Sequence, residues 1–218
     1  MKQLPLARIR HAVIVAPHPD DEAIGAYGLI RRLRARGARV RVIVVTDGTG
    51  SHPGSLRWPA PRLAALRRRE SRAILARIGV DARATTFLHL ADGALHAMGA
   101  RHRAALRRAV LAPRGCDLLV LPARDDDHPD HRAVAAACAG LPVRRQVDYL
   151  VWPNRRSRSR RASHRLPLGH LTAAKRGAIL RYRSQTGAIT DDPGGFTISR
   201  AELAAFARPV ELFRERAR

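Results

Sequence analysis

The sequence is poor in several residue types, and each shortage excludes something. Its two cysteines, Cys116 and Cys138, are too few for a disulfide framework, so we expect both to be small core residues. The longest apolar run near the amino terminus, 12–16, is too short for a membrane span or a signal-peptide core. We therefore expect a cytoplasmic protein without a membrane span. The sequence carries no signal for its oligomeric state.

Aromatic residues make up 4% of the chain, and lysine occurs only as Lys2 and Lys175. Arginine therefore supplies nearly all the positive charge behind the formal net charge of +23, which favours an anionic partner. The scarcity of aromatics leaves no stacking platform for bases and argues against nucleic acid. The densest arginine run, 155–161, is either a flexible charged loop or a surface for an anionic substrate.

Apolar segments alternate with amphipathic ones along most of the chain. The apolar segments predict strands at 12–16, 40–45, 84–88, 118–121 and 147–151. The amphipathic segments predict helices at 21–36, 61–78, 98–111, from 129 onward, and at 172–183. This alternation predicts a Rossmann-like three-layer α/β/α fold with a mostly parallel central sheet. We expect one domain over residues 1–218, with an arginine-rich loop at about 153–169 and a short mixed segment at the end.

Two clusters of histidine and aspartate follow predicted strands. The first, at 18–22, reads His-Pro-Asp-Asp-Glu, and the second, at 128–131, reads His-Pro-Asp-His. Sites in such sheets form outside the carboxyl ends of the strands, so we expect the two clusters to meet. A capped strand end would explain either cluster alone, but it does not explain both.

The spacing within the clusters suits a metal. His18 and Asp21 lie three residues apart across a strand-to-helix turn, and His128 and His131 repeat that offset. Three such ligands with the fourth position left to water make a catalytic zinc site, whereas four would close it. A carboxylate beside the metal, such as Asp20, can take the proton of water. The spacing alone leaves open which of the four residues stands off the metal.

Together the two clusters resemble the PIG-L (LmbE-like) family of zinc-dependent N-deacetylases, which act mostly on N-acetylglucosamine conjugates. The resemblance covers most of the chain. Weaker similarities lie at Thr46-Asp47-Gly48, Ser51-His52, Arg67 with Glu70, Asp92-Gly93, and Lys175 with Ser184-Gln185.

The resemblance implies that His18, Asp21 and His131 hold Zn²⁺ and that Asp20 is the general base. Ligands of these types also bind other divalent ions such as Fe²⁺. Glu22, at the first turn of a helix, is either a favourable partner of the helix dipole or a residue that supports the site.

The resemblance further implies that His128 stabilises the oxyanion, with Asp130 as its orienting partner. It implies substrate contacts for Arg67, Asp92 and Ser51. The expected partner is a small amino-sugar conjugate, and the arginine run indicates an anionic aglycone.

One departure from the family concerns the residues before the second cluster. Some members place an aromatic residue there, whereas this chain has Asp125, Asp126 and Asp127. These could orient ligands, bind a sugar hydroxyl or cap the following helix, and capping by Asp127 is the simplest hypothesis. The alternatives to deacetylation are hydrolysis of another acyl amide or an ester at the same metal site, or an arginine-rich nucleic-acid-binding protein with a structural metal.

Overall fold

The computed structural model describes residues 1–112, 115–151 and 162–216. Within them, a single 8-stranded sheet has the order β1-β7-β8-β6-β5-β2-β3-β4. The strands are β1 (Lys2–Gln3), β2 (His11–Ala16), β3 (Arg39–Thr46), β4 (Thr85–Leu90), β5 (Leu118–Pro122), β6 (Gln146–Tyr149), β7 (His164–Pro167) and β8 (Val210–Glu215). The helices are α1 (Asp21–Ala35), α2 (Ala60–Arg77), α3 (Ala100–Leu111), α4 (Pro129–Ala137), α5 (Leu171–Leu180) and α6 (Arg200–Phe206). Short 3-10 turns are η1 (Thr49–Ser51), η2 (Ala82–Ala84), η3 (Leu95–Ala97) and η4 (Arg183–Gln185).

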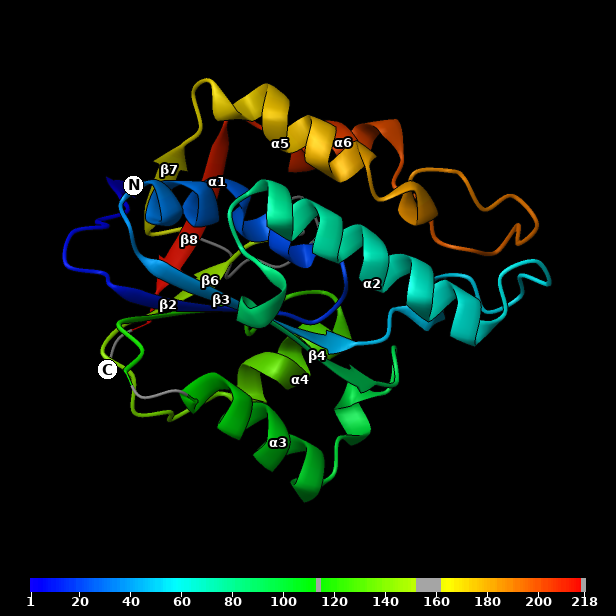
Figure 1. Cartoon of the computed structure of the whole chain (residues 1–218), viewed down its shortest axis with the longest axis horizontal. Helices are drawn as coiled ribbons and strands as arrows, with labels where there is room; N and C mark the ends of the chain where they lie inside the picture. Colours follow the sequence, from blue (N-terminus) through cyan, green and yellow to red (C-terminus); the bar gives the residue numbers. More distant parts are fainter. Residues whose placement is uncertain (113–114, 152–161, 217–218) are drawn as a thin grey trace.

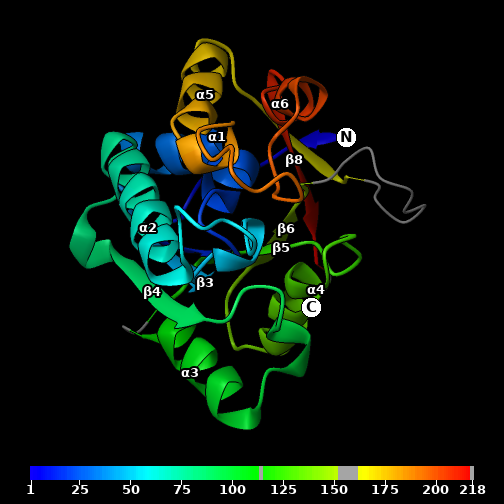
Figure 2. The same ribbon diagram turned by 90° about the vertical axis from the view of Figure 1, so that its right-hand side faces the viewer.

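The predicted fold class is confirmed. Strands β2 to β6 are parallel to their neighbours among themselves, and β1 is parallel to β7. Among the described strands, only β8 runs antiparallel, to β6 on one side and β7 on the other. Helices α1, α2, α5 and α6 cover one face of the sheet and α3 and α4 the other (Figures 1 and 2). The sheet is buried on both faces, which is why β2, β3 and β5 are nearly continuous apolar runs.

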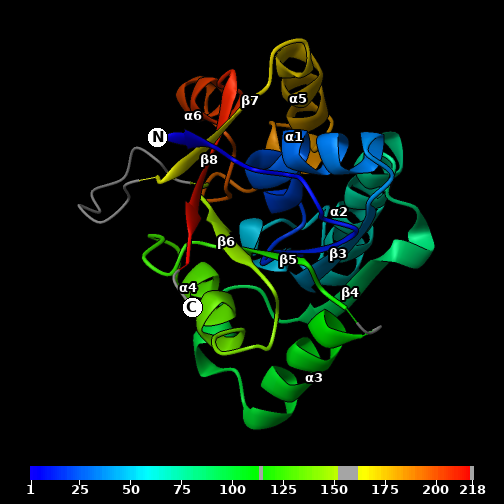
Figure 3. The same ribbon diagram turned by 90° about the vertical axis from the view of Figure 1, so that its left-hand side faces the viewer.

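The carboxyl-terminal third was only partly predicted. Strands β7 and β8 and helix α6 were missed there, and β7 interrupts the loop predicted at about 153–169. The short strand β1 at the amino terminus was also missed. Figure 3 shows the amino terminus beside β7, at the far edge of the sheet from β4. The arginine run at 155–161 lies outside the described residues. No helix within them is both long and apolar enough to span a membrane. Both cysteines are free; Cys138 is buried in the core as predicted, whereas Cys116 is only partly buried against it.

Helix α1, which begins within the first histidine and aspartate cluster, bends near Ala26 (φ −141°, ψ 16°). Near this kink the N–H groups of Gly28 and Leu29 donate to the carboxylate of Glu211, over 2.8 and 3.0 Å. The buried ammonium of Lys175 lies 3.0 Å from the same carboxylate and balances its charge. Strand β8 and helix α5 thereby support the backbone of α1 where its regular hydrogen bonding is interrupted.

Candidate metal centre and active site

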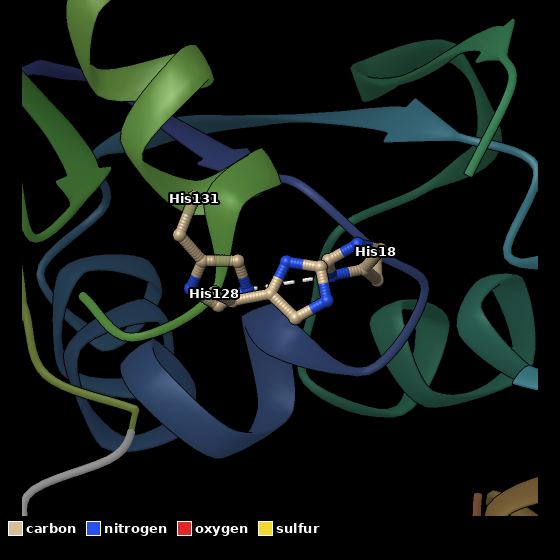
Figure 4. Close-up of side chains that lie close together, drawn as sticks. All are labelled: His18, His128 and His131. Carbon is tan, nitrogen blue, oxygen red and sulfur yellow. Dashed lines mark hydrogen bonds between the residues drawn. The ribbon is translucent and has the colours of Figure 1, made fainter. Parts of the chain in front are cut away.

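The two clusters meet where the strand order of the sheet reverses. Strand β2 has β3 on one side and β5 on the other, so the connections after β2 and β5 leave a crevice at their carboxyl ends. The first cluster occupies the turn from β2 into α1, and the second occupies the turn from β5 into α4. Figure 4 shows His18, His128 and His131 converging from these two turns.

Three of the predicted ligands place one atom each at the corners of a small triangle. Nδ1 of His18 lies 3.2 Å from Oδ2 of Asp21, and Nε2 of His131 lies 3.2 Å from the same oxygen. The two nitrogens are 3.3 Å apart. A tetrahedral zinc ion with bonds of 2.0–2.1 Å separates its ligand atoms by roughly 3.3 Å. The donor set and its spacing therefore fit such an ion without rearrangement.

The electrostatics of this triangle also favour a cation. Burial alone would raise the pKa of Asp21, but the two imidazoles beside it hold that pKa well below its usual range. Burial would lower the pKa of His131, yet Asp21 and Asp126 raise it to about 9. Against the same effect of burial, the surrounding carboxylates raise the pKa of His18 well above its ordinary value. A buried cluster that keeps a carboxylate ionised and raises the pKa of both imidazoles stabilises positive charge at its centre.

The other ring nitrogen of His18 faces two carboxylates. Its Nε2 lies 3.3 Å from Asp130 and 3.1 Å from Asp92. The Asp130 carboxylate also accepts from the N–H groups of Gly93 (2.8 Å) and Leu95 (3.0 Å). Carboxylates in this position fix the orientation of a metal-binding imidazole and raise its basicity. The Asp130 carboxylate thus orients His18, while the contact between Asp130 and His128 is made by the backbone N–H of Asp130.

Asp126 supports the second cluster. Its carboxylate accepts from the backbone N–H of His128 at 2.9 Å and lies 3.3 Å from Nδ1 of His131. The N-cap of α4 is His128, so the prediction that Asp127 caps this helix was wrong. Asp125 lies 2.6 Å from Arg214 on β8 and takes no part in either contact. Sequence reasoning left several roles open for these adjacent aspartates and favoured capping by Asp127, and only the path of the turn separates their contacts.

His128 is neutral and has a defined tautomer. Burial, with the neighbouring His18 and His131, lowers its pKa to about 4. Its Nδ1 accepts a hydrogen bond from the backbone N–H of Asp130 at 3.2 Å. A neutral ring that accepts at Nδ1 carries its proton on Nε2. His128 therefore presents an N–H donor at the site rather than a metal-binding lone pair.

Asp20 adopts a backbone conformation that L-residues rarely take, with φ 140° and ψ −27°. Its N–H donates to Oε2 of the fully buried Glu22 at 3.1 Å. Oε1 of Glu22 accepts from Ser71 on α2 at 2.6 Å and from the Tyr182 hydroxyl. Glu22 therefore holds the turn that carries Asp20. Of the two roles left open by the sequence, partner of the helix dipole or support of the site, these contacts favour the second.

Arg67 binds both the backbone and the Asp20 carboxylate of the turn between β2 and α1. Its Nη2 donates to the carbonyl of Pro19 at 2.8 Å and to Oδ2 of Asp20 at 3.1 Å, while Nη1 donates to the carbonyl of Gly48. Burial raises the pKa of Asp20 to about 7, although the Arg67 guanidinium lowers it. A carboxylate with a pKa near neutrality is suited to taking and releasing a proton.

One cavity of about 210 Å³ unites these groups. Arg67, Asp92 and Ser51, predicted as substrate contacts, line it together with His18, Asp20, Asp21, His128 and His131. Most of the other residues that line the cavity were not predicted from the sequence, because no local sequence pattern distinguishes them. They are Ile24, Gly50, Gly93, Val151, Gln185, Phe196 and Phe206.

The profile of the PIG-L family, described as GlcNAc-PI de-N-acetylase, matches residues 13–140. The chain belongs to this family. The family predicted from the two clusters is thereby confirmed, and the match spans both of them. A search of curated proteins finds no significant match.

Solved structures confirm the fold. N,N′-diacetylchitobiose deacetylase from Pyrococcus horikoshii superposes with a TM-score of 0.78 at 21% identity, over 97% of this chain and 85% of that one. A deacetylase of teicoplanin biosynthesis gives 0.68 at 17% identity, over 94% and 98%. The 4-carboxy-2-hydroxymuconate hydratase GalB from Pseudomonas putida gives 0.66 at 13% identity, over 96% and 97%. The same fold thus carries more than one reaction, and the choice between them depends on the site.

Proposed function

We propose that this protein is a metal-dependent hydrolase that removes an N-acetyl or similar N-acyl group from an N-acetylglucosamine-type conjugate. The observation that carries the proposal is the triangle of His18, Asp21 and His131 beside Asp20 and His128 in one cavity. Family membership supports the same reaction.

His18, Asp21 and His131 would hold the ion, and the mixed nitrogen and oxygen donors suit Zn²⁺, with Fe²⁺ as the alternative. When bound, such an ion supplies a Lewis acid that acidifies water and polarises a carbonyl. Asp130, Asp92 and Asp126 keep the two imidazoles oriented. The remaining steps belong to side chains that line the cavity without taking part in the triangle.

Asp20 takes the proton of the attacking water as the new carbon–oxygen bond forms at the amide carbon. The Nε2–H of His128 donates a hydrogen bond to the oxygen that becomes negative. The carbon–nitrogen bond then breaks, and the proton held by Asp20 passes to the leaving amine. Acetate and the free amino sugar are the products. Each of these two groups is worth about 10²- to 10⁴-fold in rate.

The walls of the cavity suit a small amino sugar. Arg67, Asp92, Ser51 and Gln185 offer hydrogen-bonding groups, and Phe196 and Phe206 offer apolar surface. Sugars present both kinds of surface, with hydroxyls at the rim and C–H groups on the ring face. We therefore keep Arg67, Asp92 and Ser51 as the proposed sugar contacts, and an anionic aglycone remains a prediction from the arginine run at 155–161.

The test measures amine release from a panel of N-acetylglucosamine conjugates by purified protein that has been stripped with a chelator and reloaded with Zn²⁺ or Fe²⁺. Activity that disappears with the metal and returns with one of the two ions supports the proposal and identifies the ion. Matched panels of other N-acyl amides and of esters separate deacetylation from its alternatives. Full turnover by the stripped protein contradicts the proposal.

A further inference from the structure

Few of the acidic side chains of this chain are fully exposed to solvent. All 18 of them lie within the described residues, and only Asp81 and Asp127 are exposed. Eight are buried, namely Asp20, Asp21, Glu22, Glu70, Asp126, Asp130, Asp148 and Glu211, and the other eight are partly exposed. The net charge of +23 therefore understates how positive the solvent-facing surface is.

One layer of helices carries much of this charge. Helices α1, α2 and α5 lie together over one face of the sheet (Figures 1 and 2), and the acidic residues within them, Asp21, Glu22 and Glu70, are all buried. The exposed arginines of these helices and of the turns that end them form what we call the arginine layer: Arg31, Arg34, Arg36, Arg62, Arg69, Arg72, Arg77, Arg176, Arg181 and Arg183. Across the described part of the chain, none of these guanidinium groups forms an ion pair with a carboxylate.

The arginine layer contains an apolar groove of about 260 Å³ between α2 and α5, above α1. Its floor includes the apolar side chains of Tyr27, Ile74, Ile78 and Ala178, and Arg77 and Arg181 stand at its rim. Leu180, the residue before Arg181, is 38% exposed. Apolar surface is thus available next to the two guanidinium groups.

We propose that the arginine layer docks on an anionic phospholipid bilayer, with the groove between α2 and α5 receiving apolar parts of the lipid. The positive charge is spread over three helices rather than confined to the rim of the groove, which suits an extended anionic surface better than a single acidic segment. Guanidinium groups flanking apolar surface are typical of proteins that lie on membranes. Nucleic acid fits less well, because no aromatic side chain of these helices is exposed to stack on bases.

The experiment sediments the metal-loaded protein with phosphatidylcholine vesicles that contain or lack phosphatidylglycerol. We expect binding only to the anionic vesicles, with loss of binding as salt is raised. The double variant Arg77→Gln/Arg181→Gln should lower the partition coefficient about thirtyfold, roughly fivefold for each charge removed. Its deacetylase activity on a water-soluble substrate should be unchanged, because neither residue lines the catalytic cavity.

The matched control removes the same charge from the opposite face, as Arg101→Gln/Arg108→Gln on α3, and should bind almost as well as the unmodified protein. Gly177→Gln fills the groove without changing charge, since no atom lies within 4 Å of a Cβ at that position, and should also weaken binding. Equal losses from both arginine pairs, equal binding to neutral vesicles, or binding to duplex or single-stranded nucleic acid without binding to vesicles would overturn the proposal. The failure of vesicle binding with intact deacetylation leaves the proposed catalytic function standing.

Discussion

The backbone N–H of Asp130 donates to Nδ1 of His128 across 3.2 Å, and this one bond sets the chemistry of the imidazole. It places the ring proton on Nε2, while burial and the neighbouring imidazoles lower the pKa of the ring to about 4. His128 is therefore a neutral donor at neutral pH. A group of this kind stabilises a developing oxyanion without binding the metal.

We predict that His128→Ala lowers kcat by about 10²- to 10³-fold while the protein keeps its metal. The loss should appear in kcat more than in KM, because the hydrogen bond strengthens as negative charge develops. Steady-state kinetics together with the metal content of the same preparation provide the check. Loss of metal in this variant would instead place His128 among the ligands.

Asp126 should govern metal affinity through His131. Its carboxylate lies 3.3 Å from Nδ1 of that imidazole, so Asp126→Ala should weaken metal binding by about 10- to 100-fold. Asp125→Ala is the matched control, since that carboxylate contacts Arg214 instead. Competition with a chromogenic chelator measures both affinities. Equal losses in the two variants would remove the distinction drawn between the adjacent aspartates.

Arg67 should set the pH at which the enzyme becomes active. Burial raises the pKa of Asp20 and the Arg67 guanidinium lowers it, so kcat/KM should fall as the pH drops through the pKa of this carboxylate in the metal-loaded enzyme and the base becomes protonated. Arg67→Met removes the lowering effect, and the acidic limb of the profile should move to higher pH. A bound cation lowers the same pKa in both proteins, so the shift between their profiles is the quantity to measure. An unmoved limb contradicts the assignment of Asp20 as the base.

Two helix glycines should respond oppositely to alanine. A Cβ at Gly25 would lie 2.3 Å from Cδ2 of the fully buried Tyr149, so Gly25→Ala should destabilise the fold by about 1–3 kcal/mol. Gly177 has no atom within 4 Å of the same position, and Gly177→Ala should stabilise by roughly 0.5–1 kcal/mol. Thermal or urea unfolding measures both changes. Equal changes in the free energy of unfolding would contradict the close packing of α1 on β6.

The sequence predicted the sheet well where strands are buried on both faces. Such strands are short apolar runs bounded by turns, as in β2 and β5, and the helices between them keep a clear period. Strands β7 and β8 lie toward the edge of the sheet and mix charged with apolar residues, so their periodicity is weak. Their pairing depends on contacts between segments far apart in the chain, which no local pattern records.

The candidate site was likewise predicted only in part. The meeting of the two clusters could be predicted because each follows a buried strand of the same sheet. Their supports could not, because Asp126, Tyr182 and Ser71 reach the site only once β5, η4 and α2 are in place. Only the structure separates the two contacts of Asp130, whose backbone N–H donates to His128 while its carboxylate faces His18.

The separation of metal binding from proton transfer is tested most directly by measuring zinc content and turnover together in Asp20→Asn. The substituted side chain keeps its size and its place beside Arg67 but no longer accepts a proton. The account predicts about one zinc per chain, as in the unmodified protein, and a kcat lower by about 10²- to 10⁴-fold. Asp127→Asn, at an exposed carboxylate, should change neither quantity. Full turnover by Asp20→Asn, or loss of its zinc, would contradict the account.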